Sequence, residues 1–114
     1  MDNCIFCRIV SGESPAKLLF HDSLVTAFED SHPIAPVHVL VVPNRHIPTL
    51  ADAEPADEPL LGHMILVGRQ MAILKGIDRS GYRLVINTGP DAGQSVFHLH
   101  LHVIGGRALP FRFE

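Results

Sequence analysis

The sequence predicts an α+β domain in which an antiparallel sheet is combined with one long helix and a short N-terminal helix. Three observations support this fold class. Apolar runs of strand length occur in pairs, separated by short polar turns that are typical of hairpins. Residues 59–75 alone carry apolar side chains at helical spacing over several turns. The 114 residues show no repeat or internal boundary, so we expect one domain over residues 1–114.

The first half of the chain predicts one short helix and three strands. A helix over residues 4–12 ends at a glycine, which favours a helix C-terminus. Two apolar stretches, 17–20 and 24–29, flank a polar His-Asp-Ser turn and predict a β-hairpin. Residues 37–42 are rich in β-branched side chains and are followed by a proline, as expected of a buried strand.

The long helix is predicted over residues 59–75, with Asp57 as its N-cap and Gly76 just past its end. Its apolar side chains form two adjacent stripes. The first stripe is Leu60, Met64, Val67, Met71 and Leu74, and the second is Leu61, Ile65, Gly68 and Ala72. Together they are wider than contact with one sheet requires, so we expect part of this face to meet a second subunit.

Two further strands are predicted over residues 82–87 and 96–104. The second strand alternates histidine with aliphatic residues. Side chains two apart on a strand share a face, so the imidazoles of His98, His100 and His102 should form one row above the sheet. The intervening aliphatic side chains, Leu99, Leu101 and Val103, should then enter the core.

A row of three imidazoles admits two kinds of chemistry and one structural alternative. Imidazole is a common zinc ligand. It is also a nucleophile, because its neutral form is abundant near pH 7. The structural alternative is an exposed strand face that happens to be rich in histidine. The loop before the strand favours an active site, since Gly89, Gly93, Ser95 and Asn87 could offer hydrogen-bond donors to a phosphate.

Composition excludes several other classes of protein. The formal charge of −3 is spread along the chain, so no basic footprint for nucleic acid is present. No apolar run approaches the length of a membrane span, and residues 1–4 lack the features of a signal peptide. We therefore expect a cytoplasmic protein in which both cysteines are reduced.

Residues 98–104, HLHLHVI, match the histidine-triad signature of three histidines alternating with apolar residues. Other segments fit the same pattern in order over almost the whole chain, namely CIFCRI at 4–9, FEDS at 28–31, PIAPVH at 33–38, VPNRHI at 42–47, NTG at 87–89 and GQS at 93–95. The chain therefore resembles the histidine triad (HIT) family, and within it the Hint branch of nucleotide-binding proteins.

The resemblance implies a HIT-like fold that forms a homodimer, with the sheet continuous across the two-fold axis and the long helix at the interface. It implies hydrolysis of purine nucleoside phosphoramidates, in which AMP or GMP is joined to an amine. The position of His100 is that of the nucleophile, which forms a nucleotidyl-histidine intermediate. His102 matches a residue at the phosphate and leaving group, and either His102 or Ser95 could protonate the departing amine. No cofactor is implied for catalysis.

The other residues implied by the resemblance surround the nucleotide. Asp30 matches the carboxylate that holds the ribose hydroxyls, and His38 matches a histidine that steadies the triad through hydrogen bonds. The base and sugar are implied to contact Ile5, Phe6, Ile9, Phe28, Ser31 and Leu40. The phosphate and leaving group are implied to contact Asn87, Gly93, Gln94 and Ser95.

Cys4 and Cys7 form a C-x-x-C pair, which alone could be a metal half-site, a redox pair or two buried thiols. In several bacterial HIT proteins, and in the related galactose-phosphate uridylyltransferases, a similar pair binds structural zinc with two histidines. The resemblance therefore implies a zinc site of Cys4, Cys7, His46 and His98. His21, His32 and His63 are expected to be solvent-exposed.

Other functions stay open at this point. Sister branches of the family hydrolyse dinucleoside polyphosphates, which also requires attack at a nucleotidyl phosphorus. The alternatives from other classes are a nucleotide-binding regulatory or scaffold protein with residual turnover and a metal-storage or metal-sensing dimer. The tail, residues 107–114, has no tryptophan, unlike many Hint members. The nature of the leaving group is therefore left open.

Overall fold

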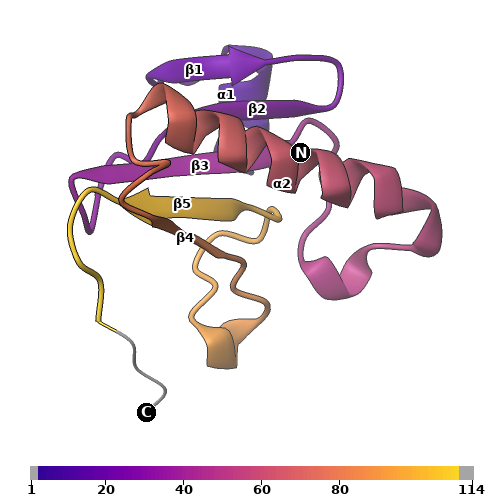
Figure 1. The fold of residues 1–114 in the computed structure, drawn as a ribbon. Helices are drawn as coiled ribbons and strands as arrows, with labels where there is room; N and C mark the ends of the chain where they lie inside the picture. The colour runs from indigo at the N-terminus through magenta and orange to yellow at the C-terminus, as the bar shows by residue number, and fades with distance from the viewer. Residues whose placement is uncertain (1–2, 111–114) are drawn as a thin grey trace.

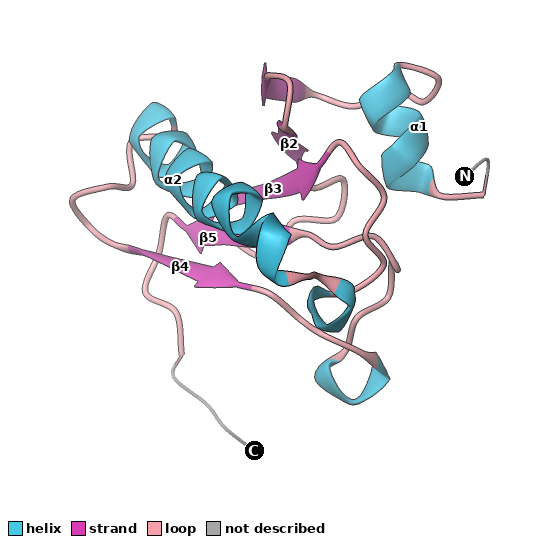
Figure 2. Cartoon of the chain, turned by 90° about the vertical axis from the view of Figure 1, so that its right-hand side faces the viewer, coloured by secondary structure: helices cyan, strands magenta, loops and turns pink. Residues whose placement is uncertain are grey.

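The computed structural model describes residues 3–110 and contains a five-stranded sheet between two helices. The helices are α1 (Ile5–Ser11) and α2 (Glu58–Leu74), and the strands are β1 (Leu18–His21), β2 (Val25–Glu29), β3 (Val37–Pro43), β4 (Tyr82–Val85) and β5 (Leu101–Gly105). Neighbouring strands are antiparallel, in the order β1-β2-β3-β5-β4. α2 covers one face of the sheet and α1 lies at the other (Figure 1, Figure 2). The predicted α+β class is confirmed.

Alternation along β2 and β3 divides the core between the two faces. Every residue of β3 is buried, because helices and loops cover both of its sides. One cluster joins α2 to the strand residues Val25, Ala27, Val39 and Val41. The other cluster joins Phe6 and Ile9 of α1 to Phe28, Leu40 and Val42. The first cluster is the main core, and the second forms one end of the site described below.

α2 approaches the sheet closely at Gly68. A Cβ atom at this position would lie 3.0 Å from Leu101 Cδ2 and 3.5 Å from Val103 Cγ2. A larger residue would therefore push α2 away from β5. Within the first predicted stripe, Leu60, Met64, Val67 and Met71 are buried, whereas Leu74 is exposed.

The two ends of α2 differ in how well the sequence predicted them. Gly76 ends the helix as expected, with φ +73, and the N–H groups of Gly76 and Ile77 donate to the carbonyls of Ile73 and Ala72. Asp57 holds the N-cap position of α2 as predicted, but its side chain makes no capping hydrogen bond to the helix. Its carboxylate does not cap α2 but accepts from the Glu54 N–H and from Arg45, because a short 3-10 turn precedes the helix.

The last strand is shorter than the sequence predicted. β5 begins at Leu101, so His98 and His100 lie in the segment before it. The cause is found at the end of β3, where Pro43 has no N–H and its carbonyl accepts from the His98 ring at 2.8 Å. The regular ladder therefore stops at Leu101, and the Leu99 N–H donates instead to the carbonyl of Ile47 in the loop after β3. β4 is likewise shorter than the predicted 82–87.

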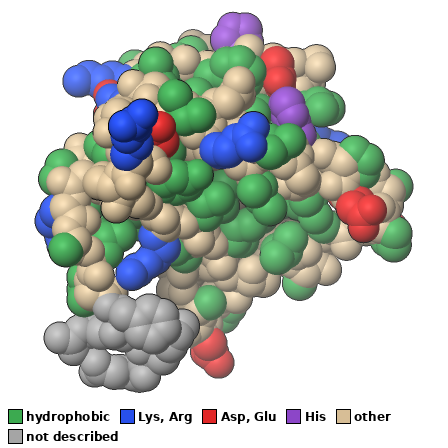
Figure 3. Space-filling view, in the orientation of Figure 1, with side chains coloured by type: hydrophobic (Ala, Val, Ile, Leu, Met, Phe, Trp, Pro, Cys, Tyr) green, Lys and Arg blue, Asp and Glu red, His purple; other side chains and the backbone are tan. Residues whose placement is uncertain are grey.

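An apolar surface remains on the outer side of α2. Ile65, Leu66, Ile73 and Leu74 are each about half exposed. Hydrophobic side chains gather over the middle of this face in the space-filling view (Figure 3). β4 is at the edge of the sheet, so one side of its backbone has no partner strand among residues 3–110. No helix in this part of the chain is long and apolar enough to span a bilayer.

We expect Gly68→Val to lower the free energy of unfolding by about 1–3 kcal/mol, because the added side chain would overlap Leu101 and Leu84. Gly62→Val is the matched control in the same helix, where a Cβ would meet nothing within 4 Å. Its effect should stay within about 0.5 kcal/mol. Urea denaturation followed by circular dichroism measures both, and equal effects would contradict the close packing of α2 on β5.

Candidate active site and metal centre

A cavity of about 1330 Å³ opens on the α1 face of the sheet. Its walls come from α1, the loop after β2, the middle of β3, and strands β4 and β5. Most residues that the sequence assigned to nucleotide binding line it, namely Ile5, Phe6, Ile9, Phe28, Asp30, Ser31, Leu40, Asn87, Ser95, His100 and His102. Segments far apart in the sequence therefore meet at one concave surface.

Strand register explains why these side chains share one face. Residues directly opposite each other in antiparallel strands project to the same side of the sheet. His102 of β5 pairs with Leu40 of β3 and with Val85 of β4, which gives one row across the cavity. The next row, two residues along each strand, is His38, Ile104 and Arg83.

The three triad rings lie on the α1 side, although only His102 belongs to β5. The Phe6 ring packs edge-to-face against His98 and His100, with centroids 5.9 Å and 5.2 Å away. The rings of His100 and His102 are 4.9 Å apart. Leu99, Leu101 and Val103 enter the core on the α2 side. The predicted alternation is therefore kept across the end of the strand.

His100 has a fixed ring orientation. Its Nδ1 atom lies 2.7 Å from the backbone carbonyl of His98, which can only accept, so Nδ1 donates. A neutral imidazole carries one proton, and Nε2 is therefore left with a free lone pair. The side chain is buried apart from the part that lines the cavity. This arrangement provides a nucleophilic nitrogen at the cavity wall.

A chain of hydrogen bonds orients His102. The Ile34 N–H donates to Nδ1 of His38, so the proton of the neutral His38 ring is on Nε2. This Nε2 lies 2.9 Å from His102 Nδ1 and 3.3 Å from an Asp30 carboxylate oxygen. His38 thus donates to His102, and the remaining proton of His102 is on Nε2. Asp30, His38 and His102 form a hydrogen-bonded group rather than a metal site, since His38 Nε2 is protonated.

Burial keeps these rings uncharged. It is the main cause that lowers the pKa of His38, His98 and His102. Burial, with the neighbouring His100 and His38, lowers the pKa of His102 to about 4. At neutral pH His102 is therefore a neutral hydrogen-bond donor rather than an imidazolium.

A second cluster lies beside the triad, where Cys4, Cys7, His46 and His98 place four possible ligand atoms within 4.8 Å of one another. His98 Nδ1 is 3.2 Å from Cys4 Sγ, 3.5 Å from Cys7 Sγ and 3.2 Å from His46 Nδ1. Cys7 Sγ is 3.3 Å from His46 Nδ1. Tetrahedral zinc with ordinary Zn–S and Zn–N bonds has ligand atoms about 3.3–3.8 Å apart, so this donor set fits zinc.

The protonation of the cluster also fits a cation. His98 donates from Nε2 to the Pro43 carbonyl, so its Nδ1 is an unprotonated donor atom facing the two sulfurs. Burial and the adjacent Cys4 raise the pKa of Cys7 to about 11 in the absence of a metal. Thiols that resist ionisation in this way become thiolates when a divalent cation binds.

Residues 11–109 match the sequence model of the family described as the HIT domain. The chain belongs to the HIT domain family. The relatives it matches agree with this. A HIT family hydrolase from Legionella pneumophila is 41% identical and has a TM-score of 0.93, covering 96% of this chain and 97% of that one. A purine nucleoside phosphoramidase from Escherichia coli K12 is 44% identical over 108 residues, 95% of this chain and 91% of the relative.

A third relative bears on the metal centre. A zinc-bound histidine triad family protein from Mycobacterium smegmatis is 35% identical and has a TM-score of 0.83, covering 99% of this chain and 84% of that one. Together with the four-residue cluster, this likeness makes zinc a possible ligand of the present HIT protein. The predicted family and the HIT-like fold are confirmed.

Two residues assigned to the nucleotide lie outside the lining of the HIT cavity. Gln94 is buried, and its side chain accepts from the Gly89 N–H and donates to the carbonyls of Pro48 and Val96. The Gly93 N–H donates to the Pro90 carbonyl. The N–H groups of Gly89 and Gly93 are therefore engaged within the loop, and Gln94 shapes the segment that carries Ser95.

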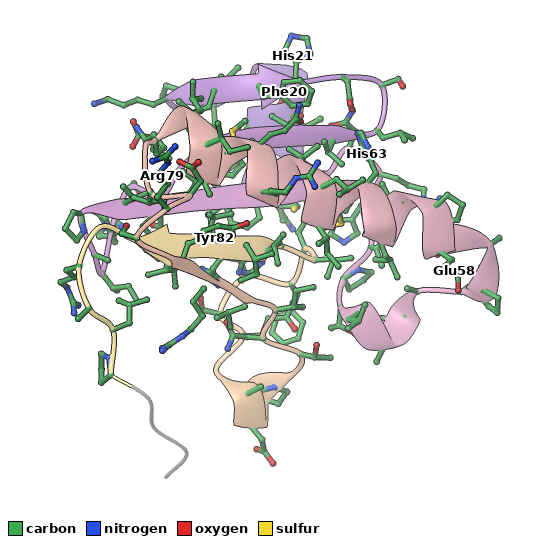
Figure 4. All side chains as sticks on the ribbon, viewed as in Figure 1. Phe20, His21, Glu58, His63, Arg79 and Tyr82 are labelled. Atoms are coloured by element: carbon green, nitrogen blue, oxygen red, sulfur yellow. The ribbon has the colours of Figure 1, made fainter. Side chains whose placement is uncertain are left out.

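Three further histidines and two basic side chains lie outside the groups described above. His21 and His32 are exposed as expected, whereas His63 is only partly exposed. His63 Nε2 lies 2.7 Å from an Asp22 carboxylate oxygen. His21 and His63 are labelled in Figure 4. Lys17 and Arg83 also line the cavity, although the sequence did not mark them. Alternation along residues 82–87 could have indicated Arg83, since it places Arg83, Val85 and Asn87 on one face.

We expect stability to fall at acid pH partly through His102. Its folded-state pKa of about 4 lies below the ordinary 6.5, so between these values the unfolded chain binds more protons. The stabilisation is complete above pH 6.5 and is lost as the pH falls towards 4. Between pH 7 and pH 5 the free energy of unfolding should fall by about 1 kcal/mol more for the native chain than for His102→Asn, after allowance for solvent screening.

Urea denaturation at the two pH values measures this difference. His21→Asn, at the exposed end of β1, controls for removal of a histidine and should behave like the native chain. An equal loss for the native chain and His102→Asn would show that His102 is not held neutral by the fold.

Proposed function

We propose that the chain is a purine nucleoside phosphoramidase that acts through a nucleotidyl intermediate on His100. One observation carries the proposal: His100 donates from Nδ1 to the His98 carbonyl at 2.7 Å, which leaves Nε2 free beside the cavity. The relative from Escherichia coli is named for this activity. Polyphosphate hydrolysis would use the same nucleophile and is the competing proposal.

The shape of the cavity supports placing the nucleoside at its α1 end. Phe6 and Ile9 of α1 and Phe28 and Leu40 of the sheet form an apolar wall for a base. Asp30, at the end of β2, is a partly exposed carboxylate that can accept hydrogen bonds from a ribose diol. A nucleoside in this position has its 5′ phosphorus directed towards His100.

The reaction consists of two in-line displacements. In the first, the His100 Nε2 lone pair attacks phosphorus, a P–N bond to the ring forms, and the bond to the substrate amine breaks. In the second, water attacks the same phosphorus, its proton returns to the group that protonated the amine, the bond to His100 breaks, and a nucleoside monophosphate is released. Imidazole suits both steps because it is a nucleophile and a leaving group.

Neighbouring donors stabilise the charge that develops on the phosphoryl oxygens. The His102 Nε2–H is oriented by the bond from His38 to Nδ1, and it costs no reorganisation during the reaction. Ser95 lines the same wall of the cavity and adds a hydroxyl. The proton taken by the departing amine comes from Ser95 or His102.

Zinc fits the cluster of Cys4, Cys7, His46 and His98, and we propose that these four residues hold it. When bound, zinc supplies a closed tetrahedral cross-link rather than a reactive position. The ligands come from the N-terminus of α1, the loop after β3 and the segment before β5. They hold α1 and its apolar side chains against the nucleophile. Catalysis itself uses only side chains of the cavity.

We also propose that residues 1–114 form one HIT domain that assembles as a homodimer in the cytoplasm, without a nucleic-acid or membrane partner. The half-exposed Ile65, Leu66 and Ile73 of α2 and the open edge of β4 lie on neighbouring parts of the surface. A two-fold axis beside β4 would cover both and continue the sheet. The two thiols of the metal cluster suit a reducing compartment.

We expect His100→Ala to lower turnover of a fluorogenic adenosine phosphoramidate by at least about a thousandfold, because the attacking nitrogen is lost. His21→Ala is the matched control, since His21 is exposed and does not line the cavity. Steady-state rates measure both variants. Comparison with diadenosine tetraphosphate tests the competing proposal. Equal turnover by native chain and His100→Ala would overturn the assignment of the nucleophile.

We expect the native chain to contain about one zinc ion per subunit, and Cys4→Ser to lose it, because one of four ligands is removed. Elemental analysis after dialysis measures the metal content, and thermal unfolding measures the stability that the cross-link provides. His21→Ala should keep its zinc. Native protein that stays free of metal when it is produced and dialysed with zinc would contradict the site.

A further inference from the structure

Arg83 is a cation on the cavity face that has no role in the function proposed above. It lies on β4, opposite Ile104 of β5, and therefore projects to the same face as His102. It is exposed and lines the cavity. Arg83 and His102 are diagonal cross-strand neighbours, a relation in which residues are about 7–8 Å apart. A side chain as long as arginine can span this distance.

The charge of Arg83 is not neutralised by any carboxylate among residues 3–110. Asp30 lies 3.3 Å from His38, and Glu29 lies 3.2 Å from Lys75. The guanidinium of Arg83 instead donates from Nη1 to the Pro110 carbonyl at 3.0 Å. This bond holds one edge of the guanidinium, and its other N–H groups have no hydrogen-bond partner within residues 3–110. An uncompensated guanidinium at a cavity wall favours a bound anion.

The order of strands indicates which part of the substrate Arg83 would meet. The apolar wall of α1, β2 and β3 suits the nucleoside, and His100 and His102 follow at β5. β4 is the next strand beyond them, on the side away from α1. A group attached to the far side of the phosphorus therefore extends over Val85 and Arg83. This step rests on the proposed function.

We propose that Arg83 recognises an anionic group on the leaving group, a carboxylate or a phosphoryl group close to the scissile bond. A guanidinium pairs with either group through two parallel N–H bonds. An amino acid joined to the nucleotide through its nitrogen carries such a carboxylate. A neutral or cationic amine does not, and a cationic amine would be repelled.

The test uses adenosine phosphoramidates that share one type of P–N bond and whose leaving groups carry different charges. The leaving groups are glycine, glycinamide, 1,2-diaminoethane and aminomethylphosphonate. For the native chain we expect kcat/KM to be about tenfold higher for glycine than for glycinamide, as for a partly exposed charged hydrogen bond. The diamine should be the poorest substrate. Comparing kcat/KM for the glycine and aminomethylphosphonate compounds shows whether the site prefers a carboxylate or a phosphoryl group.

Arg83→Gln should reduce the ratio of glycine to glycinamide towards one, and Arg83→Lys should keep part of it. Arg79→Gln is the matched control, because Arg79 lies in the exposed turn between α2 and β4 and does not line the cavity (Figure 4). It removes the same charge and should keep the native ratio. An unchanged ratio in Arg83→Gln, or an equal decrease in Arg79→Gln, would overturn the proposal.

Binding measurements separate this proposal from the proposed function. The same compounds are titrated calorimetrically into His100→Ala and into His100→Ala with Arg83→Gln, where attack on phosphorus is removed. Tighter binding of the glycine compound that depends on Arg83 supports the anion site even if the native chain hydrolyses none of them. Absence of turnover alone would count against the phosphoramidase, whereas equal affinities for glycine and glycinamide compounds would count against Arg83.

Discussion

The candidate site depends on the hydrogen bonds and contacts made by His98. Its ring is completely buried, donates to the Pro43 carbonyl, and presents Nδ1 to Cys4, Cys7 and His46. Its backbone carbonyl accepts from His100 Nδ1 and fixes the orientation of the nucleophile. One residue therefore links the end of β3, the start of α1 and the proposed reacting nitrogen. A buried polar ring of this kind is tolerated only because each of its polar atoms has a partner.

Hydrogen bonds also determine which ring nitrogen of His38 and of His102 carries the proton. The Ile34 N–H fixes the tautomer of His38, and His38 fixes the tautomer of His102. Burial lowers the pKa of both rings and so disfavours their charged forms. The rings are therefore neutral donors and acceptors of known direction. A protonated His102 would lack the lone pair on Nδ1 that accepts from His38. Burial behind Phe6 and α1 is thus part of the chemistry of the cavity.

The sequence was most informative where a local period governs the structure. Alternation predicted correctly that Leu99, Leu101 and Val103 enter the core while the histidines face away, since a side chain's direction depends on its own backbone. It failed for the length of β5 because that length depends on Pro43, a residue more than fifty positions earlier. Asp57 has the residue type of a cap, yet Arg45 and the Glu54 N–H occupy its carboxylate. Alternation places Arg83 on one face with Val85 and Asn87, but only the pairing of β4 with β5 brings that face to the cavity.

The histidine row was determined by the sequence itself, because a spacing of two residues places side chains on one face of any extended segment. The spacing treats the three histidines alike. Only the tertiary structure gave each a different environment: His98 among two thiols, His100 against a carbonyl, and His102 beside His38. Their partners come from α1, the loop after β3 and β3 itself, which are distant in sequence. Hydrogen bonds across such distances exist only once the sheet has assembled.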